Sequence, residues 1–138
     1  MPGVKTLRRI AITIVAFALI FVAVTLVALE GSEVVVLHTA LAVPEPRATR
    51  VWIADYDGSA WIEAASPERA FYRDIVADPD VELTRNGERV KYRAEPVTAP
   101  EGHQLIRALL RQRYGWADAW IGLLADTSSS IAIRLKPR

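Results

Sequence analysis

The feature that most constrains the fold is an uninterrupted apolar segment near the N-terminus. Residues 10–29 read IAITIVAFALIFVAVTLVAL, with no charged side chain and only Thr13 and Thr25 polar. At about 1.5 Å per residue, a helix of this length reaches roughly 30 Å, which is the thickness of the hydrocarbon core of a bilayer. The segment therefore predicts one transmembrane helix and leaves residues 30–138 for a folded domain.

The charges around this segment predict its orientation. Three basic residues lie in the stretch 1–9, and no acidic residue does. The positive-inside rule places that stretch in the cytoplasm and the domain outside, as in a single-pass membrane protein. A cleaved signal peptide is the alternative. The length of the apolar run, and leucines at positions 26 and 29 where a cleavage site needs small residues, favour an uncleaved anchor.

The composition of residues 30–138 excludes several classes of function. This part is long enough for one modest core. It holds all 16 acidic residues and 14 of the 17 basic ones, so it lacks the excess positive charge of a nucleic-acid-binding domain. The chain has no cysteine, which excludes disulfides and thiolate chemistry. His38 and His103 lie far apart in the sequence and lack metal-site spacing, so no metal site is predicted.

The best-specified local structure is a β-hairpin around Asn86-Gly87. This dipeptide between β-rich runs is the strongest short-range signal for a two-residue type I′ turn. It places residues 80–85 opposite residues 88–93. In that register apolar side chains share one face and opposite charges pair on the other, and a slip of one residue would scramble both faces.

Hydrophobic patterns predict the other elements of the domain. Ser66 is predicted to cap a short helix, with Pro67 in its first position. Six strands with two or three short helices indicate a mainly β (α+β) domain built on an antiparallel sheet or barrel. The remaining predicted strands are 34–42, 50–54, 60–64 and 131–135, and the later helices are 100–114 and 116–125.

Several segments of the domain carry a resemblance to a known family. The matching residues are Arg50-Val51-Trp52, then Ser66-Pro67 with Arg69, Tyr72 and Arg73, then residues 77–83, and finally residues 113–118. From about residue 34 to the C-terminus the chain resembles the pyridoxamine-phosphate-oxidase-like split β-barrel family. Within that family it is most similar to the deazaflavin-dependent nitroreductases and quinone reductases. The resemblance implies a six-stranded antiparallel split β-barrel.

The resemblance also implies an activity. The sequence contains no P-loop, GxGxxG, HExxH or GxSxG pattern, so a bound cofactor would have to carry the chemistry. The implied cofactor is a deazaflavin of the factor-420 type, with FMN as the alternative, and the implied acceptors are quinone-like or nitroaromatic small molecules. A homodimer is implied by analogy. The implied cofactor-binding residues are Arg50, Trp52, Ser66, Arg69 and Arg73, and the candidate proton donors are Tyr72 and Tyr114.

Two interpretations of the arginines remain open at this stage. Arg69 and Arg73 could hold phosphate groups beside a helix N-terminus, or they could pair with neighbouring carboxylates on a solvated helix face. The charge pattern around the anchor also predicts that the domain lies outside the cytoplasm, whereas reduced deazaflavin is a cytoplasmic coenzyme. A non-catalytic anchored barrel that binds a ligand or partner is therefore the alternative function.

Two further features have a structural and a functional interpretation. His38 lies inside a predicted strand, where a hydrogen-bonded, half-buried histidine is the commoner case; the resemblance also permits a haem ligand there. Trp116 and Trp120 lie one helical turn apart on one side of a short helix. Packing at the end of a core is the favoured role for this pair, and lining a ring-shaped cofactor is the alternative.

Overall fold

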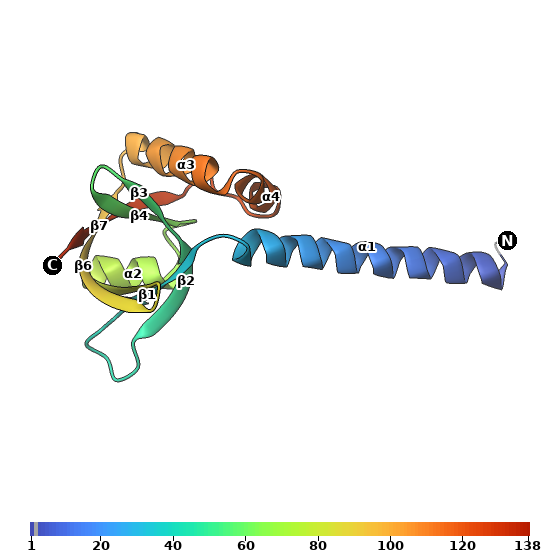
Figure 1. The fold of residues 1–138 in the computed structure, drawn as a ribbon, viewed down its shortest axis with the longest axis horizontal. Coiled ribbons are helices and arrows are strands. Elements are labelled where there is room, and N and C mark those ends of the chain that lie inside the picture. Colours follow the sequence, from blue (N-terminus) through green and yellow to red (C-terminus); the bar gives the residue numbers. More distant parts are fainter. Residues whose placement is uncertain (2) are drawn as a thin grey trace.

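The computed structural model describes residue 1 and residues 3–138. A long N-terminal helix leads into a curled antiparallel sheet that carries three short helices (Figure 1). The helices are α1 (Val4–Glu30), α2 (Ala70–Ala77), α3 (Pro100–Tyr114) and α4 (Trp116–Leu124). The strands are β1 (Val34–Thr39), β2 (Arg47–Trp52), β3 (Ala54–Tyr56), β4 (Ser59–Ala64), β5 (Asp80–Arg85), β6 (Glu88–Val97) and β7 (Ile131–Pro137).

Helix α1 contains the whole apolar segment and extends it by six residues toward the N-terminus. It projects away from the sheet (Figure 1), and its most apolar stretch buries no residue against the rest of the structure. Its length and composition are sufficient to cross a membrane. A signal sequence near the N-terminus has the same properties.

The seven strands form one antiparallel sheet in the order β2-β1-β5-β6-β7-β4-β3. The sheet curls into a half-barrel, and α2 lies within its curve (Figure 1). Phe71, Tyr72 and Ile75 of α2 are buried against the inner face of the sheet, where they meet inward-facing strand residues. The predicted class, a mainly β domain on an antiparallel sheet, is therefore confirmed.

The Asn86-Gly87 hairpin forms in the predicted register. Strands β5 and β6 pair from Asp80 opposite Arg93 to Arg85 opposite Glu88. Both turn residues have positive φ, 53° for the asparagine and 79° for the glycine, as a type I′ turn requires.

The predicted number of six strands is wrong, because the predicted strand 50–54 breaks at Ile53. Strand β2 pairs with β1 and ends at Trp52, whereas β3 begins at Ala54 and pairs with β4. Ile53 itself is fully buried, and both its backbone N–H and its carbonyl meet the hydroxyl of Tyr114. A side chain from a distant helix thus satisfies the backbone at the point where the chain changes partners.

Two predicted element boundaries also need correction. Ser66 does not cap α2: its carbonyl accepts the N–H of Arg69 in a turn, and the helix begins at Ala70. Strand β1 ends at Thr39 and not at residue 42, because Ala40 has a φ of 53°. A left-handed residue cannot continue a strand, so the chain turns into the loop that precedes β2.

Helices α3 and α4 cover the outer face of the sheet and form a second core. Ile106, Leu110 and Tyr114 of α3 are buried there with Trp61 and Ala132 from the strands. Each helix of this pair thereby buries an apolar face, which is the dominant contribution to its stability.

An ion-pair cluster centred on Arg107 holds this layer to the sheet. The Arg107 guanidinium donates to both carboxylate oxygens of Glu63 in β4, at 2.9 and 3.1 Å, and to Asp118 in α4 at 2.6 Å. All three side chains are largely buried, with 15%, 12% and 5% exposed. Their mutual pairing therefore offsets the free-energy cost of removing the three charges from water.

Replacing Arg107 with leucine should lower the free energy of unfolding by about 3–5 kcal/mol, because two carboxylates would be left without their cation. Urea unfolding followed by near-UV circular dichroism measures the change. Arg89→Leu is the control, since Arg89 pairs with Glu82 at an exposed site and should contribute less than about 1 kcal/mol. Equal losses in the two variants would contradict the role assigned to the cluster.

Candidate functional site

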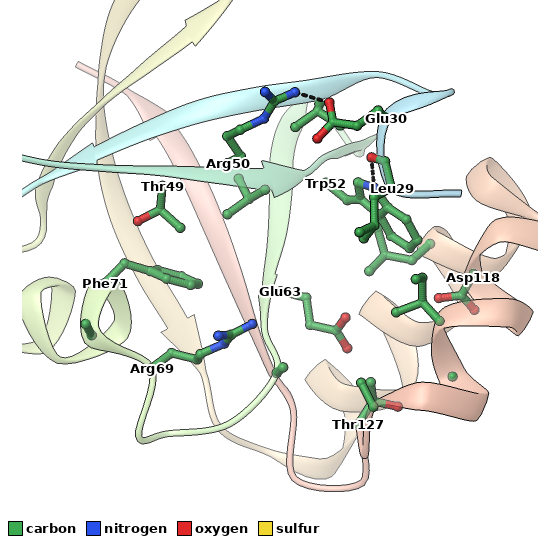
Figure 2. Close-up of a pocket in the computed structure, with 18 of the residues that line it drawn as sticks. Leu29, Glu30, Thr49, Arg50, Trp52, Glu63, Arg69, Phe71, Asp118 and Thr127 are labelled. Carbon is green, nitrogen blue, oxygen red and sulfur yellow. Dashed lines mark hydrogen bonds and ion pairs between the residues drawn. The ribbon is translucent and has the colours of Figure 1, made fainter. Parts of the chain in front are cut away.

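A pocket of about 610 Å³ opens beside the edge strand β2. Its walls come from β2, the start of α2, the C-terminal end of α1 and helix α4 (Figure 2). Strand β2 is the outermost strand on its side of the sheet, so one of its backbone edges is not paired with a further strand. The volume falls within the range of small-molecule and cofactor sites.

Arg69 is the cation that the pocket leaves free. Its side chain extends from the start of α2 toward the middle of the pocket, in the direction of Glu63 on the other side (Figure 2). Within the described part of the chain its guanidinium has no hydrogen bond or ion pair. Of the two interpretations left open, pairing of Arg69 with neighbouring carboxylates is not formed among the described residues, and Asp74 binds Thr39 and Arg47 instead. An unpaired guanidinium at a pocket wall can bind an anionic group.

The first turn of α2 adds hydrogen-bond donors beside Arg69. The N–H groups of Tyr72 and Arg73 bond to the carbonyl of Arg69. Those of Ala70 and Phe71, two residues that line the pocket, have no partner among the residues the structure describes, and no side chain caps the helix. Free N–H groups at a helix start favour an anion.

The other three pocket arginines are already paired, and Arg107 is held by Glu63 and Asp118 as described above. Arg50 binds Glu30 at the end of α1 (Figure 2), and both side chains are at least half exposed. Arg47 donates to Asp74 at 2.7 Å. Burial alone would raise the pKa of Asp74, but hydrogen bonds from Thr39 and Arg47 outweigh it and hold that pKa below its ordinary value.

Trp52 supplies a rigid aromatic wall. Its ring stacks on Tyr114 with the centroids 4.3 Å apart and the planes 9° from parallel, and its indole N–H donates to the carbonyl of Leu29 at 3.4 Å. These two contacts fix the ring between the sheet and the end of α1 (Figure 2). A ring held in this way can pack against a flat cofactor or acceptor.

The junction between α1 and the domain is clamped by charge. Glu33 accepts hydrogen bonds from Arg85 at 2.5 and 3.0 Å and binds Arg113 as well. The hydrogen bond from Arg85 holds the pKa of Glu33 below its ordinary value, against the effect of burial. Arg85 also binds Asp55 at 2.8 Å and lowers the pKa of that carboxyl. The clamp fixes where α1 ends relative to the pocket.

The structure brings together three of the five predicted cofactor-binding residues, since Arg50, Trp52 and Arg69 all line the pocket. Ser66 and Arg73 do not line it: Ser66 lies in the turn before α2, and Arg73 is exposed one helical turn beyond Arg69. The roles of these five residues stay predictions.

Neither candidate proton donor lines the pocket. Tyr72 is buried in the inner core beneath α2. Tyr114 is 3% exposed, and its hydroxyl accepts the N–H of Ile53 at 3.0 Å and lies 2.7 Å from the carbonyl of Glu33. Burial raises the pKa of Tyr114. A hydroxyl already engaged by three backbone groups is not free to move a proton.

Sequence reasoning missed five charged pocket residues, because their positions depend on contacts between distant elements. Only one of them carried a signal: Glu63 is a charge inside a strand that is otherwise apolar, and such a charge needs a buried partner. The five are Glu30, Arg47, Glu63, Arg107 and Asp118.

His38 has a structural role in this structure. Its Nε2 lies 3.0 Å from the hydroxyl of Thr84 on the neighbouring strand, and burial lowers its pKa. The described residues contain no group of three or more histidine, aspartate or glutamate side chains that could hold a metal ion.

Comparison with known proteins identifies the fold and the family. A conserved hypothetical protein of Mycobacterium tuberculosis superposes with a TM-score of 0.59 at 18% identity, covering 85% of this chain and 79% of that one. A FAD-binding protein of Mesorhizobium loti superposes with a TM-score of 0.57 at 18% identity, covering 80% of this chain and 85% of that one. An F420 reductase superposes with a TM-score of 0.52 at 19% identity, covering 82% of this chain and 92% of that one. No curated protein matches the chain significantly.

The fold is also similar to that of a putative pyridoxamine 5'-phosphate oxidase of Listeria innocua, with a TM-score of 0.56 at 13% identity, covering 82% of this chain and 90% of that one, so the fold class is the split barrel. The chain belongs to the F420H(2)-dependent quinone reductase family, whose model matches residues 15–134. It is therefore an oxidoreductase-type split barrel of a deazaflavin-dependent family, as the resemblance implied.

Tyr114→Phe should lower the free energy of unfolding by about 1–3 kcal/mol, because the buried N–H of Ile53 would lose its partner. Chemical denaturation measures this loss. If Tyr114 has only this structural role, the variant should keep its cofactor affinity and its turnover number at a temperature where it is folded. A large drop in turnover with unchanged stability would instead support the predicted role as proton donor.

Proposed function

We propose that the protein is a membrane-anchored oxidoreductase that uses a deazaflavin of the factor-420 type, with FMN as the alternative, to reduce quinone-like or nitroaromatic acceptors. The observation that carries the proposal is the unpaired Arg69 beside the open first turn of α2, in the wall of a pocket that also contains Trp52. Membership of the F420H(2)-dependent quinone reductase family supplies the cofactor class.

The residues present fit such a cofactor. A phosphate group is matched by the free guanidinium of Arg69 and the two free N–H groups beside it. Arg50 can add a second positive charge if Glu30 releases it, since that pair is exposed and of low strength. The flat ring of Trp52 suits a flat ring system. When bound, a reduced deazaflavin or flavin supplies a hydride.

The protein's own residues would bind and orient the cofactor. Arg69 and the start of α2 fix the anionic end of the cofactor, and Trp52, held by Tyr114, fixes the ring. Glu63 and Asp118, neutralised in part by Arg107, leave the pocket wall facing α4 slightly negative. That charge would keep an anionic cofactor tail on the Arg69 side and leave the other side for a neutral acceptor.

The anchor belongs to the same proposal. Residues 10–29 would span the membrane, the stretch 1–9 would remain in the cytoplasm, and residues 30–138 would form the catalytic domain outside. Leu29 and Glu30 at the end of α1 line the pocket, so the pocket would lie at the membrane surface. That position suits lipid-soluble acceptors. A homodimer remains an expectation from the resemblance.

Replacing Arg69 with glutamine should raise the Kd for the cofactor roughly ten- to hundredfold, because a charge-assisted hydrogen bond contributes about 1.5–3 kcal/mol. Fluorescence titration of the full-length protein in detergent, with the factor-420 deazaflavin and with FMN, measures it. Arg73→Gln is the matched control, since Arg73 is exposed outside the pocket, and it should change Kd less than about twofold.

Three outcomes would be decisive. A loss confined to Arg69→Gln would support the proposed phosphate site. Equal losses in both variants would move the site to the exposed face of α2. Failure of the folded wild-type protein to bind either cofactor would reject the oxidoreductase and leave the non-catalytic, ligand-binding barrel as the function.

Gly122 offers a test of the acceptor side of the pocket. It lines the pocket from α4, and a Cβ at this position would meet no atom within 4 Å. Gly122→Leu should therefore fold normally but fill the pocket and raise the KM for a short-chain quinone. Gly122→Ala is the control: it should gain up to about 1 kcal/mol of stability from helix propensity and keep its activity. Identical kinetics in the two variants would contradict an acceptor site beside α4.

A further inference from the structure

Helix α4 has an apolar face that the domain does not cover. Trp116, Leu123 and Leu124 are 57%, 81% and 48% exposed. They share a face with Trp120, since the four residues follow the i, i+4, i+7, i+8 spacing of one helical stripe. The only charge on the helix, Asp118, is 4% exposed and turned to Arg107. The outward face of α4 is therefore entirely uncharged.

This face continues directly onto the apolar surface of α1. The ring of Trp120 lies 5.6 Å from that of Phe21, and its indole N–H donates to the hydroxyl of Thr25 at 3.0 Å. At 1.5 Å per residue, these two α1 residues lie about 13 and 7 Å before the end of the helix at Glu30. Both are within the segment predicted to span the membrane.

The contact between the two helices leaves no polar group in need of water. Thr25 donates its proton to the carbonyl of Phe21 at 2.8 Å and accepts the indole N–H of Trp120. In a lipid environment an unsatisfied donor is costly, and internal pairing of this kind removes the cost. The contact is thus suited to a position where water is excluded.

The orientation of α4 also matches a bilayer surface. In Figure 1, α4 is seen end-on whereas α1 lies along the picture, so the two helices cross. With α1 spanning the bilayer, α4 lies along the membrane plane. Helices of this kind bury an apolar face about 5–10 Å into the boundary between headgroups and acyl chains, and tryptophan is enriched at that depth.

We infer that α4 is an interfacial membrane helix, whose face of Trp116, Leu123 and Leu124 is immersed in the lipid around the end of α1. The inference rests on the anchor in the proposed function and adds a second membrane contact. The domain is then held flat against the bilayer, and the pocket, which Leu29 and Ile121 line from the two helices, faces the lipid boundary.

Site-directed spin labelling of the full-length protein in phospholipid nanodiscs tests the inference. The chain has no cysteine, so a single introduced cysteine carries the label. Leu123→Cys reports on α4 and Leu19→Cys on the middle of the anchor. Val76→Cys on α2, which is 65% exposed, is the matched control in water. The readout is the ratio of collision rates with oxygen, which concentrates in lipid, and with a water-soluble nickel chelate.

The label at position 123 should resemble the one at position 19, with a ratio several-fold higher than at position 76. A label at 123 as accessible to nickel as at 76, with the label at 19 still in lipid, would overturn the inference and leave the anchor intact. Strong dipolar coupling between labels at 123 would assign the face to a second copy and also overturn it. A label at 19 exposed to nickel would reject the anchor itself. The cofactor titration tests the cofactor site separately, because it does not depend on any of these three results.

Discussion

The contacts of Tyr114 connect three parts of the structure: the break between β2 and β3, the end of α1 and the pocket wall. Its hydroxyl binds the backbone of Ile53, where the chain passes from β2 to β3, and the carbonyl of Glu33, where the chain leaves α1. Its ring supports Trp52 in the pocket wall. Ile53 lies at the break and has no strand partner, so the Tyr114 hydroxyl stabilises the buried backbone where the chain changes from pairing with β1 to pairing with β4. One side chain from α3 thereby fixes the sheet, the anchor junction and an aromatic surface of the site.

The pocket combines charges that are neutralised by different means. Arg107 compensates two carboxylates in a buried cluster, whereas Arg50 is neutralised by an exposed carboxylate at the end of α1. Only Arg69 combines a place in the pocket wall with a free guanidinium within the described residues. Buried pairs are costly to separate and exposed ones are not. The rigid cluster is therefore structural, and the arginines beside α2 and α1 are the ones available to a ligand.

Several parts of the fold could be predicted because they depend on neighbouring residues. The Asn86-Gly87 turn sets its own register through backbone torsion angles, and the helix ending before Gly115 follows local periodicity. The prediction failed where a distant group decided the outcome. Nothing around Ile53 signals a break, since its partner is 61 residues away, and Ser66 has every property of a helix cap yet lies in a turn.

The sequence alone determined that the chain has one apolar helix of membrane-spanning length, a β-rich domain and no cysteine, because those properties follow from composition and short-range periodicity. The resemblance carried by segments between residues 50 and 83 and by residues 113–118 also led to the family and to its cofactor class. Tertiary structure decided which charges are free. It paired Asp74 with Arg47 and not with Arg69, brought Arg107 to Glu63, and laid α4 against α1. Those outcomes depend on distances between elements far apart in the chain, which sequence spacing does not encode.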